Sequence, residues 1–162
     1  MTPIDQLYLV AEIAAAILGF IAVFIALSKE NGRFSESDRH FIQALVLSSI
    51  LAIVLALTPS SLRLFFSEEV VWQYSVYLSI ALGSIVSILM AWEQLHMSTT
   101  ETRSVNWLWH VPPWGMAIAV MTSLAFAVVQ DANYVEAFVI SATLMIPLSL
   151  WCFTAIVFRK FF

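Results

Sequence analysis

Five long apolar stretches, separated by short polar segments, limit more than any other feature how this chain folds. A helix that crosses a lipid bilayer needs about 20 mostly apolar residues. The stretches cover residues 7–27, 41–57, 70–92, 111–129 and 134–158. The chain of 162 residues is 61% hydrophobic and 11% charged, whereas a soluble domain carries about 25% charged residues. A chain this short cannot hide so much apolar surface from water, so we expect lipid to be its solvent.

The apolar stretches are predicted to be helices. In lipid every backbone N–H and C=O group needs an internal partner, and a helix provides one within a single segment. The connections carry turn and capping signals, such as Asn31-Gly32, the capping box of Ser35–Asp38 and the short segment Asp131–Asn133. Met1–Asp5 has no basic residue, so the first stretch is expected to be a retained span rather than a signal peptide. We therefore predict an all-α, polytopic transmembrane helical bundle of five spans, forming one domain over residues 1–162.

Basic residues are distributed unevenly between the two sides that five spans define. One side receives the first loop, the third loop and the C-terminus. That side holds six basic residues and the other holds only Arg63; the six are Lys29, Arg33, Arg39, Arg103, Arg159 and Lys160. Because cytoplasmic loops are enriched in Lys and Arg, we predict that the N-terminus lies outside and the C-terminus inside.

Small residues recur at every fourth position on four of the five stretches. Such ridges let helices approach closely, and close packing replaces the hydrophobic drive that is absent between helices in lipid. The ridges are Ala11, Ala15, Gly19; Ala44, Ser48, Ala52, Ala56, Ser60; Ser75, Ser79, Gly83, Ser87, Ala91; and Gly115, Ala119, Ser123, Ala127. They exceed what one small bundle needs, which favours a homo-oligomer; the alternative is that every ridge packs internally.

Glu12 is the acidic residue that interrupts the first apolar stretch. Ionisable residues inside a span are costly and generally face a cavity, a pore or a partner helix. Ala16 and Gly19 share its helix face and leave room for a close neighbour or an ion path. We interpret Glu12, Ala16 and Gly19 as part of a pathway for small cations near the outer side. The alternative is an acid at the outer interface that reaches headgroup water.

Glu93 and His96 lie at the inner end of the third stretch, and His110 precedes the fourth. Glu and His at positions i and i+3 share a helix face and recur in metal-binding helical bundles. If the three side chains converge, they form a metal or haem site; the alternative is that they are polar groups at the interface. Pro147, near the middle of the fifth stretch, removes a backbone donor and predicts a kink, either a gating hinge or a static bend.

Several function classes have no support in this sequence. There is no Gly-rich phosphate loop, HExxH or GxSxG motif, so no catalytic residue and no cofactor is predicted. No basic patch predicts nucleic-acid binding. The cluster of Trp107, Trp109 and Trp114 is interpreted as an interfacial aromatic belt, with a ligand platform as the alternative. The single cysteine, Cys152, lies in an apolar run and is expected to be a buried structural thiol.

Residues 11–41 carry three short motifs, namely Gly19–Val23 in the first stretch, then Gly32–Ser35 and Asp38-Arg39 before the second. On these residues the chain resembles a group of small bacterial integral membrane proteins of uncharacterised activity. The resemblance covers about a fifth of the chain. It implies a bacterial inner membrane as the location and carries no activity with it.

Three functional hypotheses follow from these patterns. The first is a small homo-oligomeric membrane channel or transport protein for small cations. Its pore lies on the symmetry axis, because one five-helix chain is too small to enclose a wet pore. The second is a non-catalytic scaffold or accessory subunit of a membrane complex. The third is a metal- or haem-binding redox membrane protein.

Overall fold

The computed structural model describes residues 2–28, 36–96 and 111–161, and these residues are almost entirely helical. The helices are α1 (Pro3–Ser28), α2 (Glu36–Leu62), α3 (Glu68–His96), α5 (Val111–Gln130) and α6 (Tyr134–Phe161). Each of the five is long and apolar enough to cross a membrane. The predicted all-α class and the five spans are confirmed, and the chain is a multi-pass membrane protein.

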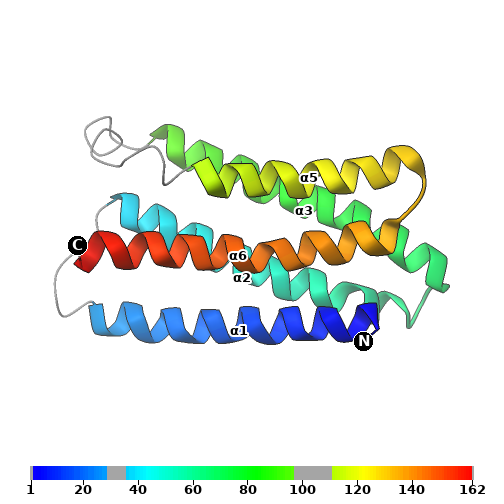
Figure 1. Cartoon of the computed structure of the whole chain (residues 1–162), viewed down its shortest axis with the longest axis horizontal. Helices are drawn as coiled ribbons and strands as arrows, with labels where there is room; N and C mark the ends of the chain where they lie inside the picture. Colours follow the sequence, from blue (N-terminus) through cyan, green and yellow to red (C-terminus); the bar gives the residue numbers. More distant parts are fainter. Residues whose placement is uncertain (1, 29–35, 97–110, 162) are drawn as a thin grey trace.

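The helices run side by side along the long axis of the molecule, with the two chain termini at opposite ends (Figure 1). α6 packs against α1, α2, α3 and α5, and its most extensive contact is with α2. α1 packs chiefly against α2 and α6 and forms one edge of the bundle. One end of the bundle therefore carries the N-terminus, the α2–α3 connection and the α5–α6 turn, whereas the C-terminus lies at the other end.

α2 is longer than predicted, because Pro59 lies inside the helix instead of ending it. The predicted stretch ended at residue 57, but α2 continues to Leu62. Proline removes one backbone N–H group from the helix. The Thr58 hydroxyl donates to the Val54 carbonyl at 2.7 Å, which adds a hydrogen bond beside the proline. α2 therefore extends five residues beyond the apolar stretch that ends at residue 57.

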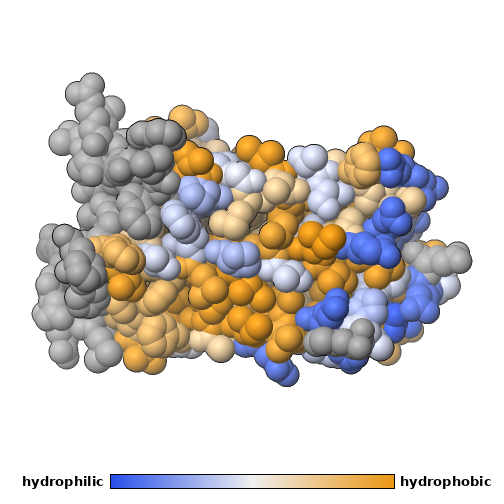
Figure 2. Space-filling model, in the orientation of Figure 1, coloured by the Kyte–Doolittle hydropathy of each residue, from blue (hydrophilic) through white to orange (hydrophobic). Residues whose placement is uncertain are grey.

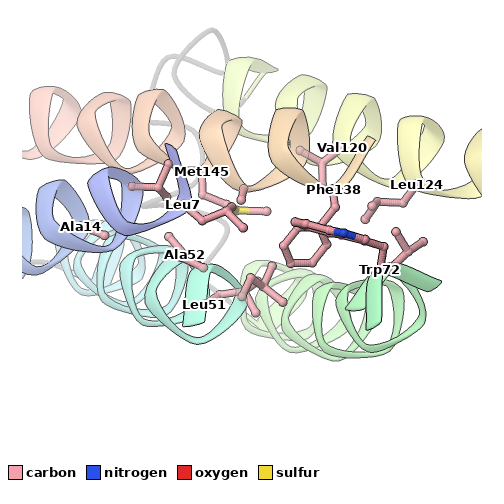
Figure 3. Packing of buried hydrophobic residues seen from close by; sticks show 14 residues of the cluster. Leu7, Ala14, Leu51, Ala52, Trp72, Val120, Leu124, Phe138 and Met145 are labelled. Carbon is pink, nitrogen blue, oxygen red and sulfur yellow. The ribbon is translucent and has the colours of Figure 1, made fainter. Parts of the chain in front are cut away.

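The main core lies where all five helices meet (Figure 3). Its buried residues include Leu7 of α1, Leu51 of α2, Trp72 of α3, Leu124 of α5 and Phe138 of α6. The rings of Trp72 and Phe138 meet edge to face with centroids 5.9 Å apart, a geometry that contributes about 0.5–1.5 kcal/mol beyond the buried area. Because lipid provides no hydrophobic drive between helices, close packing of this kind holds the bundle together.

Hydroxyl groups link α2 to α6 inside the bundle. Ser48 Oγ and Ser149 Oγ are 2.8 Å apart, and Ser49 donates to Ser149 Oγ at 3.2 Å. Ser149 also lies within 2.9 Å of the Met145 carbonyl of its own helix. All three serines are buried. They combine interhelical hydrogen bonds with small volume, which accounts for the close approach of α2 and α6.

The small-residue ridges are divided between the interior and the surface. The ridges of α2 and α3 contribute buried residues, namely Ser48, Ala52, Ala56, Ser75 and Ser79. On α1 and α5, by contrast, Gly19 and Gly115 are exposed. A Cβ added to either glycine would meet nothing within 4 Å. Parts of two ridges therefore face outward in a single chain.

The α5–α6 connection is the tight hairpin that its length predicts. Asp131 (φ 48°) and Asn133 (φ 59°) adopt the left-handed conformation, which Asp and Asn tolerate better than most residues. The Ala132 N–H bonds back to the Ala127 carbonyl at 3.3 Å, as in a Schellman C-cap. The Tyr134 hydroxyl donates to Asp131 Oδ1 at 2.6 Å. These contacts turn the chain directly from α5 into α6.

Hydrophobic side chains cover much of the middle of the molecular surface in Figure 2, and hydrophilic ones gather at the end that carries the N-terminus. Exposed large residues include Phe20, Ile88 and Ile118, each more than half exposed at 61%, 67% and 64%. Water would solvate such a surface poorly, so its natural surroundings are lipid or other apolar helices.

Candidate functional site

Glu12 points away from the bundle, on the outer face of α1. The opposite face is buried and includes Ala14 and Ile21. Ile21 is nine residues beyond Glu12, or about 2.5 turns of an α-helix, so the two side chains leave the helix in opposite directions. The Glu12 side chain is exposed, and so are Ala16 and Gly19. The structure thus places the three predicted pathway residues on one face, and that face is turned outward in a single chain.

Glu12 lies farther from the start of its helix than from the start of its apolar stretch, because α1 begins at Pro3 rather than at residue 7. A capping box starts the helix: the Asp5 N–H donates to Thr2 Oγ1 at 3.2 Å, and the Thr2 N–H donates to Asp5 Oδ2 at 2.8 Å. Nine residues separate Pro3 from Glu12, which is about 14 Å at ~1.5 Å per residue. Glu12 is therefore near the middle of the 24-residue span Pro3–Ala26.

Glu93 and His96 have different partners in the structure. His96 Nδ1 lies 2.8 Å from the Trp92 carbonyl of the same helix. The centroids of the His96 and Trp92 rings are 4.4 Å apart. Glu93 faces α2 instead, with Oε2 3.8 Å from His40 Nδ1. His110 lies outside the described residues. Within residues 2–28, 36–96 and 111–161, no three His, Cys, Asp or Glu side chains are grouped so that they could hold a metal ion.

A polar cluster of His40, Glu93, Gln94 and Trp114 lies at the end of the bundle opposite the N-terminus, and sequence reasoning missed it. His40 is only 7% exposed. Its contact with Glu93 joins α2 to α3. The Trp114 indole N–H donates to Gln94 Oε1 at 2.8 Å, which joins α3 to α5. Each residue lies near a helix end in the sequence, but their meeting depends on which helices are neighbours.

A cavity of about 100 Å³ lies between α2, α3, α5 and α6 and ends beside this polar cluster. The lining residues form one stripe on each helix, and on α2 the stripe is Phe41, Ala44, Ser48, Leu51 and Leu55. His40 and Trp114 line the polar end. Most other lining residues are apolar. The bundle therefore contains a partly open apolar cavity, with His40 and Trp114 at one end.

Acidic residues gather at the end that carries the N-terminus. Glu68, Asp131 and Glu136 line an open depression between the start of α3, the α5–α6 turn and the start of α6. Arg63 forms an ion pair with Glu68 and lies 6.0 Å from the centre of the Trp72 ring. The single basic residue predicted for this side is thus engaged with one of the acids.

Pro147 lies within α6, which is helical from Tyr134 to Phe161. The missing N–H group of a proline leaves the carbonyl four residues earlier without its helical donor, and that residue is Thr143. The Thr143 hydroxyl donates to the Val139 carbonyl at 2.7 Å in the preceding turn. Pro147 itself is exposed. Its role as a hinge stays a prediction.

The functional interpretation of these sites rests on the chain's own residues. Cys152 is fully buried, as expected of a structural thiol. The resemblance of residues 11–41 to small bacterial membrane proteins is carried by the short motifs described above and by nothing longer. Comparison with protein-family models, with curated proteins and with solved structures finds no match for this chain.

Proposed function

We propose that the protein is a homo-oligomeric membrane channel or transport protein for small cations. In this proposal the outer face of α1, defined by Glu12, Ala16 and Gly19, lines the symmetry axis. The observation that carries the proposal is the position of Glu12, which is exposed on the outside of the bundle near the middle of a span. A carboxylate at this position is surrounded by lipid in a monomer and is enclosed only when another chain covers the face.

Contact with lipid is costly for such a side chain. An Asp at the centre of a span costs about 2.5–3.5 kcal/mol on insertion scales. Glu has only one methylene group more than Asp, so this value is a guide to the cost at Glu12. Assembly around an axis lets several Glu12 carboxylates share a hydrated path. Rings of acidic side chains of this kind select cations in channels.

The neighbours of Glu12 favour a close approach of a second copy. Ala16 and Gly19 are small and exposed, and a Cβ at Gly19 would meet nothing within 4 Å. Small residues at a helix surface let two backbones come together in the membrane. The outer face of α1 therefore carries a carboxylate that is unfavourable in lipid and, beside it, small residues that allow a second helix to pack closely.

We further propose that the N-terminus lies outside and the C-terminus inside, in a bacterial inner membrane. The uneven distribution of six basic residues against one supports this orientation. In this orientation Glu68, Asp131 and Glu136 lie at the outer end, where their negative charge would raise the local concentration of cations.

Cation flux into proteoliposomes tests the role of Glu12. Glu12→Gln keeps the size of the side chain and removes its charge, so we expect K⁺ and Na⁺ flux to fall and the preference for cations over anions to be lost. Glu93→Gln is the control, because it makes the same change on α3, where Glu93 contacts His40 of α2 and lies on neither the outer face of α1 nor the acidic outer end. It should leave the ion preference unchanged. If the Glu12→Gln protein conducts with unaltered rate and selectivity, the proposed role of Glu12 is wrong.

The scaffold or accessory-subunit hypothesis uses the same face of α1. In that case another membrane protein covers Glu12, the interface is dry, and the purified protein gives no flux. Wild-type protein that is inactive in liposomes but co-purifies with a partner, and loses that partner in Glu12→Leu, would favour this alternative.

The redox hypothesis makes a separate prediction. A metal- or haem-binding protein gives a coloured preparation or metal by elemental analysis. A colourless, metal-free preparation of the full chain eliminates it.

A further inference from the structure

The cavity between α2, α3, α5 and α6 is long and slender. Its lining residues on α2 run from His40 to Leu55, a separation of about 22 Å at ~1.5 Å per residue. Those on α5 run from Pro113 to Leu124, or about 16 Å by the same helical rise. About 100 Å³ of this cavity is open to the centres of water-sized spheres, and over such a length this leaves a narrow passage that admits a file of single atoms rather than a compact ligand.

The wall of the cavity is apolar and adaptable. Met90, Met121 and Met145 line it from three different helices, and unbranched methionine side chains adjust readily to the shape of a guest. The passage is tight beside Gly83, where an added Cβ would lie 3.2 Å from Met121 Sδ. The lining Ser79 directs its hydroxyl to the backbone of its own helix at 2.8 Å. Such a wall favours hydrocarbon.

Glu93 lies beside the polar end of the cavity. It does not line the cavity itself, but it contacts His40, which does. Glu93 Oε2 is buried, and among the described residues it accepts no hydrogen bond. His40 Nδ1 lies 3.8 Å from this oxygen, which is beyond hydrogen-bond length. A buried carboxylate oxygen that lacks a donor is unfavourable. A head group that enters beside His40 and brings an N–H or O–H group to the Glu93 carboxylate therefore gains an interaction that the protein leaves open.

We propose that this cavity binds a single-chain amphiphile, with its alkyl chain along the cavity and an amine or hydroxyl head beside His40, directed toward the neighbouring Glu93 carboxylate. A flexible file of methylene groups fits the long apolar part, and the head supplies the donor. None of the residues that line the cavity belongs to α1, so this site is independent of the proposed cation pathway.

Quenching of Trp114 fluorescence measures the binding, because Trp114 lines the polar end of the cavity. The probe is an alkylamine that carries bromine next to its head group, added to the full chain in lipid nanodiscs. The difference between the wild-type signal and that of Trp114→Phe isolates this one indole. We expect saturable quenching of Trp114. Quenching that rises without saturation indicates partitioning into the bilayer only and would overturn the proposal.

Two substitutions on one helix distinguish the cavity from the lipid-facing surface. Ala117→Leu fills the cavity, since Ala117 lines it, whereas Ala119→Leu makes the same change at an exposed position. We expect Ala117→Leu to weaken binding of the amine at least about tenfold, because the leucine side chain and the alkyl chain cannot occupy the same space. Ala119→Leu should bind the amine normally. If Ala117→Leu does not fold, Gly83→Ala narrows the cavity from α3 and should also weaken the amine. Equal affinity in the filled and control variants would overturn the proposal.

The head group is tested by competition among chains of equal length. An unbrominated alkylamine and alkanol should displace the probe, and the fatty acid should compete at least about tenfold more weakly, because its carboxylate repels that of Glu93. Glu93→Gln should weaken binding of the amine about tenfold through loss of the charge-assisted hydrogen bond. The same substitution should leave binding of the alkanol unchanged, because the new amide oxygen still accepts a hydrogen bond from the hydroxyl group. A fatty acid that binds as tightly as the amine, or amine binding insensitive to Glu93→Gln, contradicts the assigned head.

Discussion

Replacing Ser149 with alanine tests whether hydroxyl contacts between α2 and α6 stabilise the bundle. The change removes the 2.8 Å contact with Ser48 and the 3.2 Å hydrogen bond from Ser49. Interhelical hydrogen bonds in membrane proteins average about 0.6 kcal/mol and reach about 1.7 kcal/mol, so two of them contribute about 1–2 kcal/mol. Ser48 keeps a bond to the Leu45 carbonyl at 3.1 Å, whereas Ser49 loses its acceptor. We expect the free energy of unfolding to fall by about 1–2 kcal/mol.

Ser75→Ala is the matched control for this measurement. Ser75 is also fully buried, but its hydroxyl donates to the Val71 carbonyl within α3 at 2.7 Å. Its removal breaks no link between helices, so we expect a loss below about 0.5 kcal/mol. Equilibrium unfolding in mixed micelles, followed by helical circular dichroism, measures both variants. Equal losses in the two variants, or zero coupling between Ser48→Ala and Ser149→Ala in a double-mutant cycle, would refute the reasoning.

Two further predictions concern assembly and topology. Ala16→Cys should form disulfide-linked dimers under mild oxidation, because the outer face of α1 meets a second copy in the proposed oligomer. Leu150→Cys, which is 47% exposed on α6, should stay monomeric; equal cross-linking of both would indicate random collision. In intact cells a membrane-impermeant maleimide should label Asn133→Cys and spare Asn31→Cys, and the reverse pattern would overturn the orientation. Cys152 is fully buried and should add no labelling to either experiment.

The existence of the helices was predictable from hydropathy, but their ends were not. Long apolar runs have only one stable backbone conformation in lipid, so the spans follow directly from them. Helix ends depend on local hydrogen bonds that hydropathy ignores. α1 starts at Pro3 because Thr2 and Asp5 form a capping box, and this pattern is visible in the printed sequence. α2 continues through Pro59, a residue that normally ends a helix, because the surrounding packing holds it in place.

The candidate sites were predictable only in part, because they depend on which helix faces meet. Glu12 stands out in the sequence as an acid within an apolar run. The outward direction of its side chain cannot be read from the sequence, because both faces of a span in lipid are apolar and neither is marked as the packed one. His40 and Glu93 come from different helices and approach each other because α2 and α3 are neighbours. The cavity has the same origin, as four separate stripes form it.

The two proposed sites lie on different helices, and this separation provides a check on both. Glu12 belongs to the outer face of α1, whereas α2, α3, α5 and α6 line the cavity. Substitutions at distant sites without shared partners usually act independently, within about 0.3–0.5 kcal/mol, which is roughly twofold in affinity. Glu12→Gln should therefore leave alkylamine binding unchanged within that limit, and Ala117→Leu should leave cation flux unchanged. If either variant abolishes both activities, the bundle responds as a unit, and neither residue can be assigned to a site of its own.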